Sequence, residues 1–153
     1  MSANDLVLER ILDAPRKNVW RCWTEEDLIK QWFCPKPWRV SKAEMDQRAG
    51  GSSLFVMNGP NGEEFPNRGV YLEIVLGEKI VFTDAFTSAW EPSPKAFMVA
   101  TVTMADAGER KTKYRAVVSH WSTEDREQHE KMGFHEGWGK AAEQLEELAR
   151  SLG

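Results

Sequence analysis

Residues 134–152 read FHEGWGKAAEQLEELARSL, and this stretch decides the fold. In a helix its apolar side chains share roughly 120° of arc, with charged side chains opposite. The apolar side chains are those of Phe134, Trp138, Ala141, Ala142, Leu145, Leu148, Ala149 and Leu152. A helix with one apolar stripe needs a large apolar partner, and a sheet is the only one the rest of the chain offers. We expect one long helix capped near Ser122, and three glycines at 133, 137 and 139 predict a close approach to the sheet or a bend.

The segment from Trp38 to Trp121 supplies that sheet, because much of it alternates between apolar and polar residues. Turn signals such as Asn58-Gly59 and Asn61-Gly62 divide it. The expected strands are 38–46, 52–58, 67–75, 79–86, 97–104 and 112–121. Residues 38–46 and 70–74 show no clean alternation, so the facing of their side chains stays open.

The N-terminal part is expected to hold one strand over 2–13 and two short helices. Asp13 as N-cap and Pro15 in the first turn indicate a helix over 16–24. Thr24 indicates the N-cap of a second helix running through Phe33. The order of strand, two helices, six strands and helix lacks βαβ alternation, so the fold class is α+β with an antiparallel meander. At 153 residues, the chain is expected to be a single domain over 1–153.

Composition and charge exclude several classes of protein. Acidic residues outnumber basic ones, 24 to 20, and the excess lies entirely within 122–153, so no basic patch for DNA or RNA is expected. No apolar run reaches the ~20 residues of a membrane span, and the N-terminus lacks a signal peptide's apolar region. Cys22 and Cys34 are interpreted as reduced thiols of a cytoplasmic protein.

Five further segments carry a resemblance to a known family. In chain order they are Gly50-Gly51 with Phe55-Val56-Met57, RGVYLEI at 68–74, KIVFT at 79–83, GFHEGW at 133–138 and LEEL at 145–148. Together they resemble the activator of heat-shock protein 90 ATPase homologue family, a member of the START-like (SRPBCC) superfamily that includes the birch pollen allergen. The resemblance extends from about Leu6 to Leu152. It implies a helix-grip fold: a curved antiparallel sheet of six to seven strands around the C-terminal helix, with an apolar cavity between them.

The sequence gives weak support for metal or covalent chemistry. His120, His129 and His135 lack the spacing of metal ligands, and no Gly-x-Ser-x-Gly nucleophile motif is present. We therefore expect no metal and no cofactor. His120 shares a strand face with Tyr114, Ala116 and Val118 and is expected to point inward, either as a hydrogen-bonded core residue or as a ligand contact.

Two carboxylates are candidates for acid–base catalysis. Asp84 alternates with Ile80, Phe82 and Phe86, and Glu73 alternates with Tyr71 and Val75. A carboxyl group buried against such residues has a raised pKa and can transfer protons. The alternative is that each acid lies at a strand end or pairs with a neighbouring Lys or Arg.

Aromatic residues give the clearest functional signal, since the chain has 7 Trp and 7 Phe but only 2 Tyr. They either fill the core or form the wall of a ligand cavity. The expected cavity residues are Trp32, Phe33, Trp38, Phe55, Tyr71, Phe82, Phe86, Trp90, Phe97, Tyr114, His120, Phe134 and Trp138. Trp90, in the long loop 87–95, is expected at the entrance.

Three functions follow as hypotheses. The first is binding of a small hydrophobic or amphipathic molecule between sheet and helix, without catalysis. The second is a cyclase- or hydratase-like enzyme using Asp84, Glu73, Tyr71 or His120 in the same cavity. The third is a co-chaperone, as the family name suggests. The eukaryotic activator has a separate N-terminal domain, for which we expect no room before Leu6, so a chaperone partner is not favoured. Edge strands make a homodimer possible.

Overall fold

The structure is a computed structural model that describes residues 3–88, 91–93 and 96–152. Its main sheet is antiparallel and seven-stranded, in the order β1-β9-β8-β5-β4-β3-β2. These strands are β1 (Asp5–Leu12), β2 (Arg39–Met45), β3 (Ser52–Asn58), β4 (Glu64–Val75), β5 (Lys79–Thr83), β8 (Met98–Asp106) and β9 (Thr112–His120). A small hairpin, β6 (Phe86–Ser88) and β7 (Glu91–Pro92), forms a separate two-stranded sheet. The described helices are α1 (Arg16–Thr24), α2 (Glu26–Ile29), α3 (Thr123–Lys131) and α4 (Phe134–Ser151).

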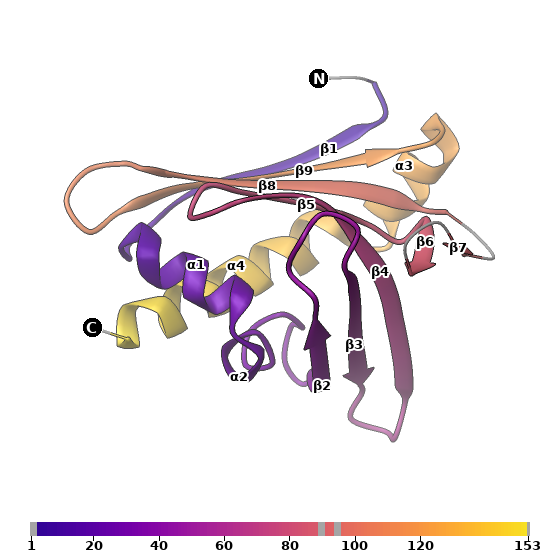
Figure 1. Ribbon diagram of the computed structural model, residues 1–153, viewed down its shortest axis with the longest axis horizontal. Helices are drawn as coiled ribbons and strands as arrows, with labels where there is room; N and C mark the ends of the chain where they lie inside the picture. The colour runs from indigo at the N-terminus through magenta and orange to yellow at the C-terminus, as the bar shows by residue number, and fades with distance from the viewer. Residues whose placement is uncertain (1–2, 89–90, 94–95, 153) are drawn as a thin grey trace.

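The sheet curves around α4, which confirms the predicted α+β helix-grip architecture. In Figure 1, β1, β9, β8 and β5 run side by side, while β4, β3 and β2 bend away from them. The helices α4 and α1 lie together on the side toward which the strands bend. Strands β1 and β2 are the two edges of the sheet. Within the part of the chain that the structure describes, none of the helices is both long enough and apolar enough to cross a bilayer.

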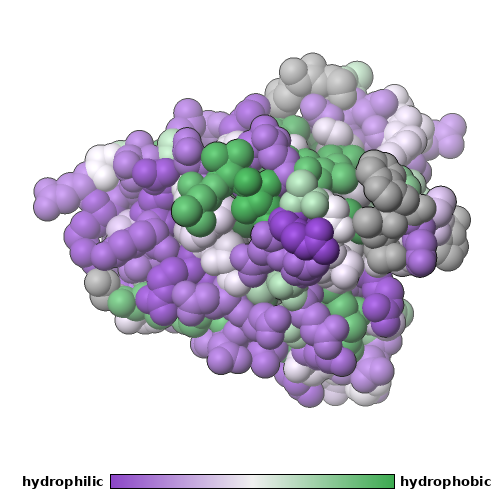
Figure 2. All heavy atoms as spheres, viewed as in Figure 1, coloured by the Kyte–Doolittle hydropathy of each residue, from purple (hydrophilic) through white to green (hydrophobic). Residues whose placement is uncertain are grey.

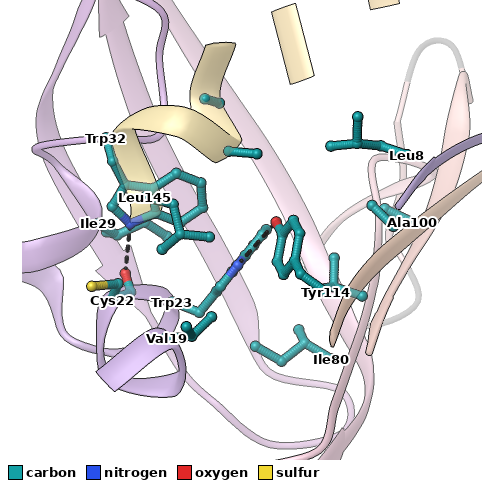
Figure 3. Packing of buried hydrophobic residues seen from close by; sticks show 14 of the residues in the cluster. Leu8, Val19, Cys22, Trp23, Ile29, Trp32, Ile80, Ala100, Tyr114 and Leu145 are labelled. Carbon is teal, nitrogen blue, oxygen red and sulfur yellow. Dashed lines mark hydrogen bonds between the residues drawn. The ribbon is translucent and has the colours of Figure 1, made fainter. Parts of the chain in front are cut away.

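The apolar stripe of α4 packs against the concave face of the sheet, as its spacing predicts. Leu145 and Ala149 are fully buried, and so are Ala116 and Val118 of β9 opposite β1. Figure 3 shows Leu145 in one cluster with Ile29 and Trp32. Burial alternates along β9, with the odd-numbered residues from Lys113 to Ser119 less buried than their neighbours. One continuous core therefore joins sheet and helices. By contrast, Figure 2 shows a mostly hydrophilic outer face with separate hydrophobic groups.

Two β-bulges explain the strand segments that lack clean alternation. The pairing of β2 with β3 shifts between Val40 and Lys42, and that of β4 with β5 shifts between Tyr71 and Glu73. An extra residue in a strand places two consecutive side chains on the same side. Leu72 and Glu73 are accordingly both exposed, although Tyr71 is buried.

Several expected boundaries were wrong, each for a local reason. The single C-terminal helix is divided into α3 and α4, because Gly133 has a φ of 97°, in the left-handed region. Of the two alternatives that the glycines predicted, a close approach to the sheet or a bend, the structure shows the bend, at Gly133. The strand expected over 79–86 ends at Thr83, whose hydroxyl accepts a hydrogen bond from the N–H of Ala85. The strand expected from Asn67 begins earlier, at Glu64.

The expected N-caps of the first two helices were also wrong. Pro15 and Glu25 stand at these positions, and neither makes a side-chain capping bond. The hydroxyl of Thr24 instead donates to the carbonyl of Trp20. The second helix ends at Ile29 and does not reach Phe33. Ser122 caps α3 as predicted, since its hydroxyl accepts from the N–H of Asp125.

Candidate functional site

A cavity of about 410 Å³ lies between α4, the segment following α1, and the strands β3, β8 and β9. Most of its wall is aromatic or thioether side chain. The lining residues are Trp23, Trp32, Phe33, Pro35, Met57, Met98, Tyr114, His129, Met132, Gly133, Phe134, Gly137, Trp138 and Ala141. Close-packed protein interiors contain few voids larger than a water molecule, so this space is not ordinary core packing.

One face of α4 forms one wall. Phe134, Gly137, Trp138 and Ala141 follow the spacing of residues that share a helix face. The rings of Phe134 and Trp138 stack with their centroids 5.5 Å apart. Gly137 interrupts this wall, because a Cβ at that position would meet no atom within 4 Å. The missing side chain therefore leaves open volume beside Trp138.

Opposite this face, three aromatic rings pack edge to face. The centroid of Trp23 lies 5.0 Å from that of Trp32 and 5.9 Å from that of Phe33. Figure 3 shows how two indole N–H groups fix this wall. The indole of Trp32 donates to the carbonyl of Cys22 at 2.9 Å, and that of Trp23 donates to the hydroxyl of Tyr114 at 3.2 Å. Both indoles thus have partners inside the protein and present apolar ring surface to the cavity.

Gln144 joins α4 to the segment that carries this aromatic wall. Its side-chain amide donates to the carbonyls of Trp32 at 2.9 Å and Cys34 at 2.8 Å. Its carbonyl oxygen accepts from the N–H of Lys36 at 3.0 Å. Gln144 is buried, so these bonds satisfy backbone groups of an irregular segment away from most solvent.

The polar atoms at the cavity belong mainly to Tyr114 and His129. Burial raises the pKa of Tyr114 above its ordinary value, whereas the bond from Trp23 lowers it. The hydroxyl is therefore protonated at neutral pH. In its bond with Trp23 the hydroxyl is the acceptor, so that bond does not use its proton. The ring of His129 packs against Phe134 with centroids 5.2 Å apart.

A histidine pair continues outward from His129. Its Nδ1 lies 2.9 Å from Nε2 of His120, and Nδ1 of His120 lies 2.8 Å from the carbonyl oxygen of Asn4. His120 is 7% exposed, so it points inward. Burial and, next, the neighbouring His120 lower the pKa of His129 to about 4, against a smaller raising effect of Asp84. At neutral pH His129 is uncharged.

A second hollow of about 430 Å³ adjoins the cavity and shares Phe33, Met57 and Met98 with it. It lies over β3, β4 and β5 and carries more polar residues. Asp84, Thr83, Asn67 and Arg68 are among them. Phe33, Met57 and Met98 therefore contribute to the walls of both spaces. Unbranched Met side chains are adaptable, so the wall that the two spaces share can change shape.

The structure brings some of the expected cavity residues together and separates others. Trp32, Phe33, Tyr114, Phe134 and Trp138 line the cavity, and Phe55 and Phe82 line the second hollow. The other expected residues that the structure describes line neither space. Trp38 stacks on Phe65, Phe97 packs on His120 and His129, Tyr71 is in the buried core, and Phe86 lies in the separate hairpin. Trp90 lies outside the described residues.

Neither candidate carboxylate lines the cavity, although Asp84 lines the second hollow. Asp84 lies just after the end of β5 and accepts from the N–H groups of Phe97 and Met98, at 2.9 and 3.0 Å. Glu73 is on the outer side of the bulge and forms an ion pair with Lys79 at 2.9 Å. Asp84 thus lies at a strand end and Glu73 pairs with a lysine, which are the two alternatives to a catalytic role that the sequence left open. Tyr71 is buried, which raises its pKa, and it makes no wall of either space.

Neither thiol nor metal chemistry has a site among the residues that the structure places. Burial raises the pKa of Cys22 to about 12 and that of Cys34 to about 11. Both thiols therefore stay protonated and unreactive. Across the described ranges, no group of three or more His, Cys, Asp or Glu side chains could hold a metal ion.

Sequence reasoning missed several side chains of the candidate site. Trp23, Met57, Met98, His129 and Gln144 were not expected at the site, although four of them line the cavity. Trp23 had a usable signal, since it shares a helix face with Val19 and Trp20. Gln144 falls within the apolar stripe of α4, beside Ala141 and Leu145, where a polar residue indicates a specific buried bond.

The chain is similar to a known protein family and to several solved structures. A family model described as Activator of Hsp90 ATPase homolog 1-like protein matches residues 13–150. Among curated proteins no match to the chain is found.

Solved structures of bacterial proteins share the fold over almost their whole length. A protein from Nitrosomonas europaea is 39% identical, with a TM-score of 0.94, covering 99% of this chain and 97% of that one. A protein from Arthrobacter aurescens is 24% identical, with a TM-score of 0.83, covering 97% and 87%. An AHSA1-like protein from Aeromonas hydrophila is 14% identical, with a TM-score of 0.74, covering 97% and 93%.

Proposed function

The chain belongs to the Activator of Hsp90 ATPase homolog 1-like family, and on that premise we propose that it binds a small hydrophobic or amphipathic molecule between the sheet and α4. The observation that carries this proposal is the cavity of about 410 Å³. Ligand sites typically measure about 300–1,000 Å³, with mostly apolar walls and a few polar groups. The cavity matches this description in volume, in its aromatic and Met walls, and in the two polar residues Tyr114 and His129.

The binding energy comes mainly from apolar burial. Each Å² of apolar surface removed from water contributes roughly 25 cal/mol. A two-ring aromatic molecule fits the volume and faces flat indole and phenyl rings. The wall is largely preformed, because Trp23 and Trp32 are hydrogen-bonded and Gln144 holds the adjoining backbone. Little ordering is then required on binding.

Binding without catalysis is favoured over acid–base chemistry. The acid–base hypothesis relies on Asp84, Glu73, Tyr71 or His120, and none of these four residues lines the cavity. Asp84 uses one carboxylate oxygen for two backbone N–H groups, and Glu73 is paired with Lys79 on the outside. The chaperone-related name belongs to the family, and no contact of the described residues adds support for such an activity.

Filling the cavity from α4 tests the proposal. Gly137→Phe places an aromatic ring in the open volume beside Trp138 and removes a helix-interior glycine. We expect it to fold normally and to abolish binding of 2-naphthol, measured by isothermal titration calorimetry against the wild type. Glu147→Phe is the matched control, because Glu147 is exposed on the same helix.

The control variant is expected to bind naphthol as the wild type does. Equal binding by a folded Gly137→Phe variant would place the guest elsewhere and refute the proposed site. Absence of naphthol binding to the wild type would refute the proposed function for compact aromatic molecules.

A further inference from the structure

We infer that His129 is a hydrogen-bond acceptor at the polar end of the cavity and selects guests that carry a hydroxyl group. In this inference His120 is a positioning residue, which fixes the protonation pattern of the His129 ring. The inference rests on the proposed function and adds the ligand class: compact hydrophobic alcohols or phenols.

The hydrogen bonds determine which nitrogen of each ring carries a proton. The carbonyl of Asn4 can only accept, so Nδ1 of His120, at 2.8 Å, must be the donor. In a neutral ring the other nitrogen is then the acceptor. Nε2 of His120 therefore accepts from Nδ1 of His129 at 2.9 Å. A neutral His129 that donates through Nδ1 has an unprotonated Nε2 with its lone pair available.

The surroundings of His129 favour its neutral ring. His120 is buried, and its ring packs on Phe97 with centroids 5.5 Å apart. His129 packs between Phe97 and Phe134, at 5.0 and 5.2 Å. Among the described residues, neither imidazole is hydrogen-bonded to a carboxylate. For His129, burial disfavours the charged form and lowers the pKa, and the opposing effect of Asp84 is smaller.

The free nitrogen of His129 is placed to meet a guest. The residue lines the cavity together with Trp138 and Met132. Within the described part of the chain, the hydrogen bond of the His129 ring is made through Nδ1 to His120, which leaves Nε2 to water or a ligand. Tyr114 lines the same cavity with a hydroxyl proton to donate.

This pair of polar groups discriminates between ligand classes. A hydroxyl group can donate to Nε2 of His129 and also accept from Tyr114. A methyl ether of the same shape lacks the donor and leaves the His129 lone pair without a partner. A carboxylate has no proton to donate to the lone pair of His129, and it must also lose its hydration in an apolar cavity. The chemistry therefore selects a neutral, hydroxylated hydrophobic molecule.

The test compares 2-naphthol with 2-methoxynaphthalene, which differ in the donor. Calorimetry is done on the wild type, on His129→Phe and, as the matched control, on His135→Phe, which changes an exposed histidine. The quantity compared is the affinity for 2-naphthol divided by the affinity for 2-methoxynaphthalene. We expect this ratio to be about three- to tenfold higher in the wild type and in His135→Phe than in His129→Phe. The ring of Phe preserves the packing against Phe97 and Phe134, and circular dichroism checks the fold.

Nitrogen NMR of the imidazole rings tests the positioning role without a binding assay. In the wild type at neutral pH, we expect protonated Nδ1 and unprotonated Nε2 in both His120 and His129. In His120→Phe, His129 is expected to lose this fixed pattern, a change that a purely structural role of His120 does not produce.

The outcomes separate the inference from the proposed function. A ratio that is the same for wild type and His129→Phe, or a protonated Nε2 in wild-type His129, overturns the inference and leaves cavity binding in place. Failure of both naphthalenes to bind the wild type overturns both.

Discussion

Replacement of Gln144 by leucine tests whether one buried amide holds the cavity wall together. The change keeps the size of the side chain but removes three hydrogen bonds to the backbone of Trp32, Cys34 and Lys36. A buried polar group left without a partner costs about 1–3 kcal/mol. Lys36 is exposed and can regain water, so the two carbonyls dominate. We expect Gln144→Leu to lower the free energy of unfolding by roughly 2–6 kcal/mol.

Urea denaturation at neutral pH measures this loss, with fluorescence and circular dichroism as two probes of one transition. Gln128→Leu is the matched control, since Gln128 is exposed on α3; its effect should stay within about 0.5 kcal/mol. Because Trp32 and Phe33 lie on the segment that Gln144 holds, naphthol binding should also weaken. A Gln144→Leu protein as stable as the control would refute the reasoning that these bonds are the main support of the wall.

Three further changes test α4, its start and the histidine pair by urea denaturation. Gly137→Ala should stabilise the protein by up to about 1 kcal/mol, because the helix favours Ala and the new Cβ meets no atom within 4 Å; a loss of stability would contradict the open volume at this position. Gly133→Ala should destabilise it by about 1–2 kcal/mol, since φ at this residue is 97°; an unchanged stability would show that the left-handed turn between α3 and α4 is not required. Between about pH 6.5 and pH 4 the unfolded chain protonates His129 and the folded chain does not, so stability falls as pH falls, by roughly 3 kcal/mol from this group. His129→Gln should lose this part of the slope and His135→Gln should keep it; equal slopes in all three proteins would contradict the lowered pKa.

The course of the main strands and the buried face of α4 could be predicted because both follow simple periods. The strand period of two holds along β9, where burial alternates from Thr112 to His120. It fails where a bulge adds a residue, near Val40 and near Tyr71. The two residues on either side of Ser41 and of Leu72 include no glycine or proline that would mark such an insertion. The facing of Glu73 could therefore not be derived from alternation.

The cavity could be predicted only in outline, because its wall joins residues from distant parts of the chain. Trp23, Met57 and Met98 meet there through the curvature of the sheet, which no local pattern determines. His129 meets His120 because the chain turns at Ser122 and α3 folds back beside β9. Their separation of nine residues matches no metal-binding or catalytic motif. The aromatic content predicted a wall, but not which rings would form it.

The side-chain NMR signals of the tryptophans test the central claim most directly. In a titration with 2-naphthol, the indole N–H signals of Trp23, Trp32 and Trp138 are expected to shift together and to saturate, because all three rings line the cavity. Trp121, which is 55% exposed and lies at the end of β9, should keep its position. Saturable shifts at Trp121 with none at the three cavity tryptophans would contradict binding between the sheet and α4.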